Sequence, residues 1–173
     1  MQVTLSKKEQ QYMSDWDLLI TDINIATMVK GNSPYGIIEN GALAINGNTI
    51  AWLGESKSIP KINSTKKVSM SGKWITPALI DCHTHLVFAG NRAWEFEERI
   101  KGKSYQEISA VGGGIISTVN ATRNCDIKTL TALSEERLLS LQKEGVGTIE
   151  IKSGYGLDLD TEIKMLQVAK ALE

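Results

Sequence analysis

The chain has 173 residues, of which 42% are hydrophobic, and this is enough to bury the core of a globular domain. Its 19 basic and 20 acidic residues nearly cancel, with an isoelectric point near 6.2, so no large electrostatic field attracts nucleic acid or anionic lipid. No apolar stretch of about 18 residues exists that could span a bilayer, and residues 1–15 lack the apolar core of a secretory signal. We therefore expect a cytoplasmic protein that binds a small molecule, with no nucleic acid and no membrane partner.

The first part of the chain has the pattern of a small β domain. Between Trp16 and about Val68, short apolar runs alternate with turn residues, which is typical of several antiparallel strands. Two runs flank Asn46-Gly47-Asn48, where Asn-Gly supplies the positive φ angles of a tight hairpin turn. We expect an N-terminal tail over residues 1–15, the β domain over residues 16–72, and a link to the next domain near residues 69–73.

After Lys66 the pattern changes to strands that alternate with helices. The apolar run 74–82 predicts a buried strand, and residues 146–151 predict a second one. Between them, leucines at helical spacing predict a helix over 127–143, with Asp126 as the N-cap and Gly145 as the stop. A further helix is expected over 160–172. Its expected buried side consists of Ile163, Leu166, Val168, Ala169 and Leu172. This is the βαβ spacing of parallel strands in an α/β protein.

The two histidines of the chain, His83 and His85, come directly after the first of these apolar runs. Side chains two positions apart on a strand point to one face, roughly 6 to 7 Å apart at the backbone, so both imidazoles can reach one metal ion. The alternative interpretation is structural: the two histidines are half-buried and cap the strand without binding metal. A structural zinc site normally needs four protein ligands, often cysteines at close spacing, and none appear nearby. The pattern therefore favours half of a catalytic metal site.

Ligand sites in parallel α/β structures lie beyond the carboxyl ends of the strands. Arg92 lies seven residues after His85, and its guanidinium can hold a carboxylate with two hydrogen bonds. The alternative interpretation of Arg92 is that it is a surface arginine that pairs with Glu95 or Glu97. Tyr155 lies between two glycines that let the backbone bend and expose the phenol, although an ordinary turn tyrosine has the same context. Both residues are candidates for substrate binding.

Three other features are weaker candidates. Gly112-Gly113-Gly114 lacks the Lys-Ser or Lys-Thr pair that ends a P-loop, so a mobile loop, or one that passes close to a ligand, is the better interpretation. Lys152 can in principle form a carbamylated metal bridge, but a charged residue at a strand end is the stronger interpretation. Tyr105, on a short helix expected over 104–110, is favoured as a packing residue.

Several segments resemble a known family. Residues 75–85 read Ile-Thr-Pro-Ala-Leu-Ile-Asp-Cys-His-Thr-His and resemble the first barrel strand of the amidohydrolase superfamily, and the β region before them resembles its N-terminal sandwich. More specifically, residues 88–92, 112–119 and 150–157 together resemble the imidazolonepropionase family. Ala78 stands where most members carry glycine, a change that leaves the two histidines untouched.

The resemblance implies an α/β fold, the start of a metal-dependent hydrolase (β/α)8 barrel preceded by a small β-sandwich part. Such a barrel typically needs about 250 residues, so residues 73–173 hold only about two of its βα units and the barrel is incomplete. The later metal ligands and the catalytic acid and base would lie on strands that this sequence does not contain. No catalytic residue is therefore assigned in this fragment, and the fragment alone is expected to be inactive.

The activity that the resemblance implies is hydrolysis of the ring amide of 4-imidazolone-5-propanoate to N-formimino-L-glutamate in histidine degradation. His83 and His85 match the family's first two metal ligands, for one divalent or trivalent ion, zinc or iron. Arg92 and Tyr155 match its substrate-binding positions, and a small-molecule substrate with a carboxylate gives Arg92 a physical role. The full-length enzyme is compatible with a homodimer.

Two alternatives stay open at this point. One is another amidohydrolase, such as a cyclic amidase or a nucleobase deaminase, that shares the first strand but not the substrate. The other belongs to a different class, a truncated, non-catalytic binding or assembly module. Arg92 and Tyr155 discriminate among the enzymes, whereas the metal content of the purified protein separates an enzyme from a non-catalytic module.

Overall fold

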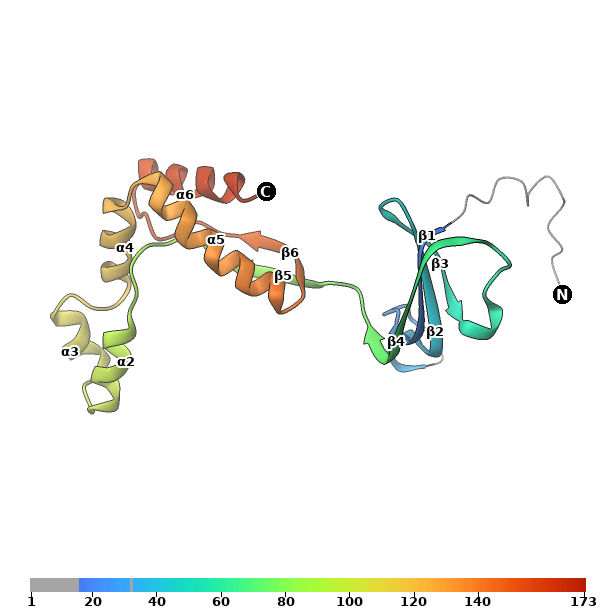
Figure 1. The fold of residues 1–173 in the computed structure, drawn as a ribbon. Coiled ribbons are helices and arrows are strands. Elements are labelled where there is room, and N and C mark those ends of the chain that lie inside the picture. Colours follow the sequence, from blue (N-terminus) through green and yellow to red (C-terminus); the bar gives the residue numbers. More distant parts are fainter. Residues whose placement is uncertain (1–15, 32) are drawn as a thin grey trace. The chain divides into compact units, whose positions relative to one another are not determined.

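The computed structural model describes residues 16–31 and 33–173, and the chain divides after Pro77 into two compact units (Figure 1). Each unit has its own hydrophobic core. The N-terminal tail expected over residues 1–15 lies outside the described residues. Among the helices of the described ranges, none has the length and apolar character that a membrane crossing requires.

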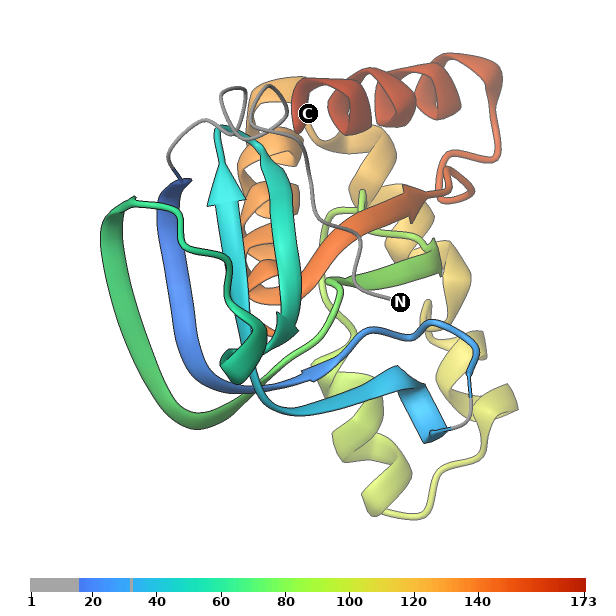
Figure 2. The same cartoon turned by 90° about the vertical axis from the view of Figure 1, so that its right-hand side faces the viewer.

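The first unit is a four-stranded sheet in the order β3-β2-β1-β4 (Figure 2). Its elements are β1 (Trp16–Ala26), the short 3-10 turn η1 (Pro34–Gly36), β2 (Ile37–Asn46), β3 (Thr49–Glu55), the turn η2 (Ser56–Ser58) and β4 (Ser64–Ile75). β1, β2 and β3 pair antiparallel as expected, whereas β4 runs parallel to β1. The expectation of antiparallel strands alone is therefore wrong for β4. The connection after β3 carries the chain to the other edge of the sheet without reversing the strand direction.

Side chains of this sheet are buried in two clusters. Ala42 and Ala44 belong to a cluster that includes Trp16, whose ring is stacked on that of Trp52 with centroids 6.0 Å apart. Leu43, which lies between the two alanines, belongs to the other cluster, with Ile23 and Ile25. Successive residues of a strand point to opposite faces, so both faces of the sheet carry apolar side chains. The described residues of this unit form one four-stranded sheet, whereas a sandwich consists of two packed sheets.

The hairpin predicted at Asn46-Gly47-Asn48 connects β2 and β3. Gly47 has a φ of +59°, whereas Asn46 and Asn48 are not among the residues with positive φ. A two-residue turn that begins with glycine in this conformation is typical of type II′. The position of the hairpin is therefore confirmed, but the positive φ is supplied by Gly47 alone.

The boundary between the units lies after Pro77, not after residue 72 as the sequence suggested. Ser71 and Gly72 have positive φ values of +48° and +77°, and the pairing with β1 shifts its register between Ser69 and Lys73. Small residues that resemble a linker thus form a bulge inside β4, which continues to Ile75.

The second unit contains the predicted βαβ arrangement. β5 (Leu79–Thr84) and β6 (Val146–Ile151) pair in parallel. The helices between and after them are α2 (Ala93–Ile100), α3 (Tyr105–Ala110), α4 (Ile115–Asn124), α5 (Ile127–Lys143) and α6 (Leu159–Ala171), labelled in Figure 1. The parallel pairing places the carboxyl ends of both strands at the same edge of the sheet.

Helix α5 matches the predicted bounds. The Asp126 carboxylate accepts a hydrogen bond of 2.9 Å from the backbone N–H of Thr129, and Gly145 follows the helix with a φ of +96°. Asp126 therefore caps the first turn, where backbone donors lack partners within the helix, and Gly145 accommodates the left-handed conformation after it.

Helix α6 begins one residue earlier than expected, and its predicted buried side is confirmed for Val168, which is buried, and for Ala169 and Leu172, which pack against the same core. The prediction is wrong for Ile163 and Leu166. Thr161, Met165 and Val168 are buried, whereas Ile163 and Leu166 are exposed. Met165 and Val168 pack with Leu130 of α5 and with Val87 and Ala89, which follow β5. Contacts with α5 and with the segment after β5 thus centre the buried face on Met165 and Val168, and helical periodicity identified only part of this face.

The prediction of a buried first strand is wrong for β5. Leu79 and Ile80 are 56% and 67% exposed. Among the described residues, β6 is the one strand that pairs with β5. This apolar run, which is typical of the inside of a larger sheet, therefore lacks the neighbours that would cover it.

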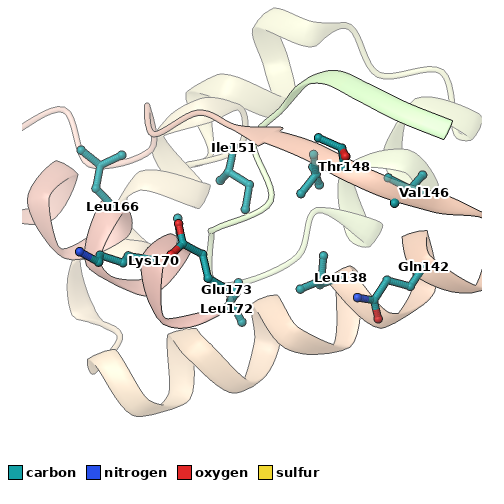
Figure 3. Close-up of a pocket in the computed structure, with 12 residues that line it drawn as sticks. Leu138, Gln142, Val146, Thr148, Ile151, Leu166, Lys170, Leu172 and Glu173 are labelled. Carbon is teal, nitrogen blue, oxygen red and sulfur yellow. The ribbon is translucent and has the colours of Figure 1, made fainter. Parts of the chain in front are cut away.

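An open cavity of about 550 Å³ lies beside β6, next to α5 and α6 (Figure 3). Leu138 and Gln142 of α5, Val146 and Ile151 of β6 and Leu166 of α6 contribute to its lining. None of its lining residues is a candidate ligand or substrate residue. In a (β/α)8 barrel each strand pairs with a strand on both sides. Among the described strands, β6 pairs with β5 alone, and residues of β6 line this cavity.

We expect Leu130→Ala to destabilise the second unit by about 2–5 kcal/mol, because it leaves a void in a core that is fully closed to solvent at this position. Urea denaturation followed by circular dichroism measures the change. Leu139→Ala is the matched control on the same helix, since Leu139 is 48% exposed, and we expect a change of about 0.5 kcal/mol or less. Equal losses for the two variants would contradict the described core.

Candidate metal centre

The two histidines lie together at the carboxyl end of β5. His83 belongs to the strand and His85 follows its last residue, Thr84. Their ring centroids are 5.4 Å apart and the ring planes are inclined by 71°. The rings are therefore on the same side of the strand, as its alternation predicts, and the opposite arrangement, which would have excluded a shared ion, does not occur.

His85 is half-buried, and its Nδ1 atom has no hydrogen-bond partner among the described residues. Buried polar atoms of folded proteins nearly always have a partner. Gly154 lies against the same ring, because a Cβ on this residue would be 3.1 Å from Cε1 and 3.3 Å from Nδ1 of His85. The unpaired nitrogen fits a ring that ligates an ion, and the glycine leaves room for that ring.

The two imidazoles fit a metal ion as part of its ligand shell. Within residues 16–31 and 33–173, no group of three or more His, Cys, Asp or Glu side chains is close enough together to hold an ion. Catalytic zinc sites use three protein ligands and an open position. The described residues thus bring two imidazoles together, which is one fewer than the protein ligands of such a site.

Tyr155 lies beside the histidines, although it comes from the segment after β6. Its ring centroid is 5.5 Å from that of His85 and 5.7 Å from that of Phe88. The parallel pairing of the strands explains this proximity, since the N–H of Lys152 donates to the carbonyl of Thr84 over 2.8 Å. Two segments that are about 70 residues apart in the sequence thus meet at one edge of the sheet.

Arg137 of α5 fixes the segment that follows the histidines. Its Nη1 atom donates to the carbonyls of Leu86 and Phe88, over 3.0 and 2.9 Å, and the guanidinium carbon is 3.6 Å from the centroid of the Phe88 ring. Burial lowers the pKa of Arg137 from its ordinary value. Sequence analysis missed this residue, and the available signal was a charge on the apolar side of α5, seven positions after Leu130.

Arg92 is paired with Glu95, which is the alternative considered from the sequence. Nε and Nη2 of Arg92 donate to the two carboxylate oxygens of Glu95, over 2.9 and 2.7 Å. The Glu95 side chain is almost fully buried and also accepts a 2.8 Å hydrogen bond from the N–H of Gly114. The hydrogen bond from Arg92, together with that from Gly114, holds the pKa of Glu95 below its usual value.

This pairing leaves part of the Arg92 guanidinium for another group. Nη1 takes no part in the contact with Glu95, and the side chain is 41% exposed. Glu95 raises the pKa of Arg92, chiefly through the hydrogen bond, with smaller electrostatic contributions from Tyr105 and Tyr155. The two candidate substrate residues are therefore close enough to interact electrostatically. Sequence analysis named Glu95 as a possible partner of Arg92, but it did not identify the hydrogen bond from Gly114 to this carboxylate.

Lys152 lies at the end of β6 and forms an ion pair with Glu150. This hydrogen-bonded pair lowers the pKa of Glu150, with a smaller contribution from His83. The structure therefore supports the interpretation of Lys152 as a charged residue at a strand end. Glu150 brings a carboxylate into the neighbourhood of His83, and sequence analysis had not singled it out.

No protein-family model matches the chain. Among curated proteins, the imidazolonepropionase of Shewanella halifaxensis is 56% identical over 160 residues, and that of Colwellia psychrerythraea is 52% identical over 162 residues. Each match covers 91% of this chain and 39% of the relative. The chain thus spans about two fifths of the length of the curated relatives that it matches.

Solved structures share the fold at low sequence identity. Ochratoxinase from A. niger has a TM-score of 0.54 at 17% identity, over 92% of this chain and 29% of its own. A prolidase, solved with N-methylphosphonate-L-proline, has a TM-score of 0.54 at 13% identity, over 79% of this chain and 26% of its own. Atrazine chlorohydrolase from Arthrobacter aurescens, solved with zinc, has a TM-score of 0.50 at 16% identity, over 90% of this chain and 33% of its own.

These structures confirm the predicted α/β fold class. At such identities they show the fold alone. The sequence comparison is more specific, since over 91% of its length the chain is similar to imidazolonepropionases, of which it spans 39%.

Proposed function

We propose that the complete protein hydrolyses the ring amide of 4-imidazolone-5-propanoate to N-formimino-L-glutamate. The observation that carries this proposal is the identity of 52% and 56% with two imidazolonepropionases over 91% of the chain. The convergence of His83, His85 and Tyr155 at one edge of a parallel sheet supports it. Because the chain spans 39% of those relatives, we assign the activity to the whole polypeptide and not to these 173 residues.

His83 and His85 would hold the metal ion, with further ligands from outside the described residues. Imidazole suits both zinc and iron, and zinc is favoured by the structurally similar atrazine chlorohydrolase, which was solved with that metal. When bound, the ion supplies a Lewis acid for the ring carbonyl and lowers the pKa of a water molecule. Gly154 and Tyr155 border the His85 ring, so they limit how a substrate can approach it.

Arg92 would hold the propanoate carboxylate of the substrate. Its guanidinium is already oriented by two hydrogen bonds to the buried Glu95, so little rotational freedom is lost when a second carboxylate binds. Tyr155 would donate a hydrogen bond to the heterocycle beside His85. Together, Arg92 and Tyr155 would fix the substrate heterocycle relative to the two histidines. The contact of the propanoate carboxylate with Arg92 would set the orientation of the heterocycle.

We expect Arg92→Ala in the whole polypeptide to lower kcat/KM for imidazolonepropanoate by about 10- to 100-fold, mainly through KM, because a hydrogen bond to a charged group contributes roughly 1.5–3 kcal/mol. Steady-state kinetics measures the effect. Arg99→Ala is the control, since it removes an exposed arginine from α2, the helix that directly follows Arg92. A KM that stays unchanged in Arg92→Ala would refute the proposed anchor, and a preference for a substrate without a carboxylate would favour another amidohydrolase activity.

We expect the double variant His83→Ala/His85→Ala of the whole polypeptide to lose its stoichiometric metal, and the 173-residue chain alone to retain little metal and no turnover. With two imidazoles, most coordination positions of the ion are left to water. Such a site binds metal more weakly than a site with a full set of protein ligands. Elemental analysis after gel filtration measures the metal. Cys82→Ala is the control, because Cys82 is exposed and alternates with His83 along β5.

Metal that stays bound in the double histidine variant would overturn the proposed ligands. A whole polypeptide that contains no metal would instead favour the non-catalytic module.

A further inference from the structure

The segment between β6 and α6, which we call the Tyr155 loop (residues 152–158), is bound by one carboxylate. Oε1 of Glu162, in the first part of α6, accepts hydrogen bonds from the backbone N–H groups of Gly156 and Leu157, over 2.7 and 2.9 Å. Ser153 and Gly154 also contribute to lowering the pKa of this carboxyl group. Two successive backbone donors of the Tyr155 loop thus share a single acceptor atom.

The backbone of the Tyr155 loop is shaped to reach this carboxylate. Gly154 and Leu157 have positive φ values of +142° and +53°, the second of which is unusual for a residue with a side chain. A Cβ on Gly156 would be 2.8 Å from the N atom of Glu162 and 2.9 Å from its Oε1. The loop therefore approaches the start of α6 as closely as only glycine permits.

Helix α4 binds the same loop from another direction. Nε of Arg123 donates to the carbonyl of Gly156 over 2.7 Å and is 2.8 Å from a carboxylate oxygen of Asp158. Lys164 of α6 in turn donates to the carbonyls of Thr122, Arg123 and Cys125 at the end of α4. The two helices that bind the Tyr155 loop are thus connected to each other.

Tyr155 comes directly before the two residues, Gly156 and Leu157, whose N–H groups donate to Glu162. Its ring contacts His85 and Phe88. Burial by itself raises the pKa of Glu162, but the hydrogen bonds from Ser153 and the loop backbone outweigh it and keep the pKa below the usual value. The carboxylate is therefore ionised at neutral pH, when its hydrogen bonds are strongest.

We propose that Glu162 is a positioning residue that fixes Tyr155 against His85 by binding the backbone of the Tyr155 loop. The proposal deepens the function proposed above and rests on it for its kinetic readout. A competing explanation is that Glu162 only interacts favourably with the N-terminus of α6, as any acidic residue in the first turn would. Asp160, which is exposed in the same turn, distinguishes the two explanations, since only Glu162 contacts the loop.

The first test measures the loop itself, in the whole polypeptide that the gene encodes. Hydrogen–deuterium exchange by mass spectrometry compares Glu162→Gln and Glu162→Ala with Asp160→Asn. We expect exchange in peptides that cover residues 153–157 to become about tenfold faster or more in Glu162→Ala, less so in Glu162→Gln, and to stay unchanged in Asp160→Asn. Peptides from β6 serve as the internal reference. Unchanged exchange in both Glu162 variants, or equal acceleration in Asp160→Asn, would overturn the proposal.

The second test asks whether Glu162 acts through Tyr155. We expect Glu162→Gln to lower kcat/KM for imidazolonepropanoate by about 10- to 100-fold, as is typical when a residue that orients a binding group is changed. In the Tyr155→Phe background the same substitution should change kcat/KM by less than about twofold, because the group that it positions is already lost. Additive losses in the double variant would contradict a role through Tyr155.

The two tests separate the failure of this proposal from the failure of the proposed function. If the wild-type protein does not hydrolyse imidazolonepropanoate, the proposed function is wrong, and the exchange measurement still decides whether Glu162 fixes the loop. If turnover is present but neither exchange nor coupling responds to Glu162, only the positioning role is wrong. Unfolding of Glu162→Ala would leave Glu162→Gln, which keeps the size of the side chain, as the decisive variant.

Discussion

The parallel pairing of β5 and β6 is the constraint on which the candidate site depends. It brings the ends of two strands together, so that the histidines after one strand meet Tyr155 after the other. An antiparallel pairing would have placed these segments at opposite edges of the sheet. Helix α5, which connects the region after β5 to β6, adds Arg137 to the carbonyls next to the histidines. The backbone topology thus determines the neighbourhood, and side-chain contacts determine its details.

Charged side chains that are mostly withdrawn from solvent fix these details. Glu95 accepts hydrogen bonds from Arg92 and Gly114. Glu162 accepts hydrogen bonds from the backbone of the Tyr155 loop. Arg137 donates to two carbonyls and contacts the Phe88 ring. Each of these groups uses its hydrogen-bonding capacity inside the unit, which offsets the cost of removing a charge from water. Such contacts limit the motion of residues that would touch a substrate, and limited motion is what accurate placement of a reacting ring requires.

Sequence analysis identified the features that depend on local pattern. The range of α5, its cap at Asp126 and the hairpin at Gly47 follow from periodicity and turn chemistry, which act over a few residues. The convergence of His83 and His85 follows from strand alternation. The parallel edge strand β4, the burial of Met165 on α6, the contact of Glu95 with Gly114 and the role of Glu162 depend on contacts beyond the local sequence pattern, for which a single sequence holds no direct signal. The exposure of β5 has the same origin, since an apolar run predicts burial only where covering elements exist.

The unpaired flank of β6 has a consequence for how a longer polypeptide with this segment is made. A ribosome adds about 5–20 residues per second, so each additional strand and helix takes seconds to emerge. Until it arrives, the hydrogen-bonding groups along β6 and the cavity beside Leu138 and Leu166 stay open to any other extended chain. Protection by a chaperone or by slow release from the exit tunnel would therefore matter most at this stage of synthesis, well before a finished enzyme exists.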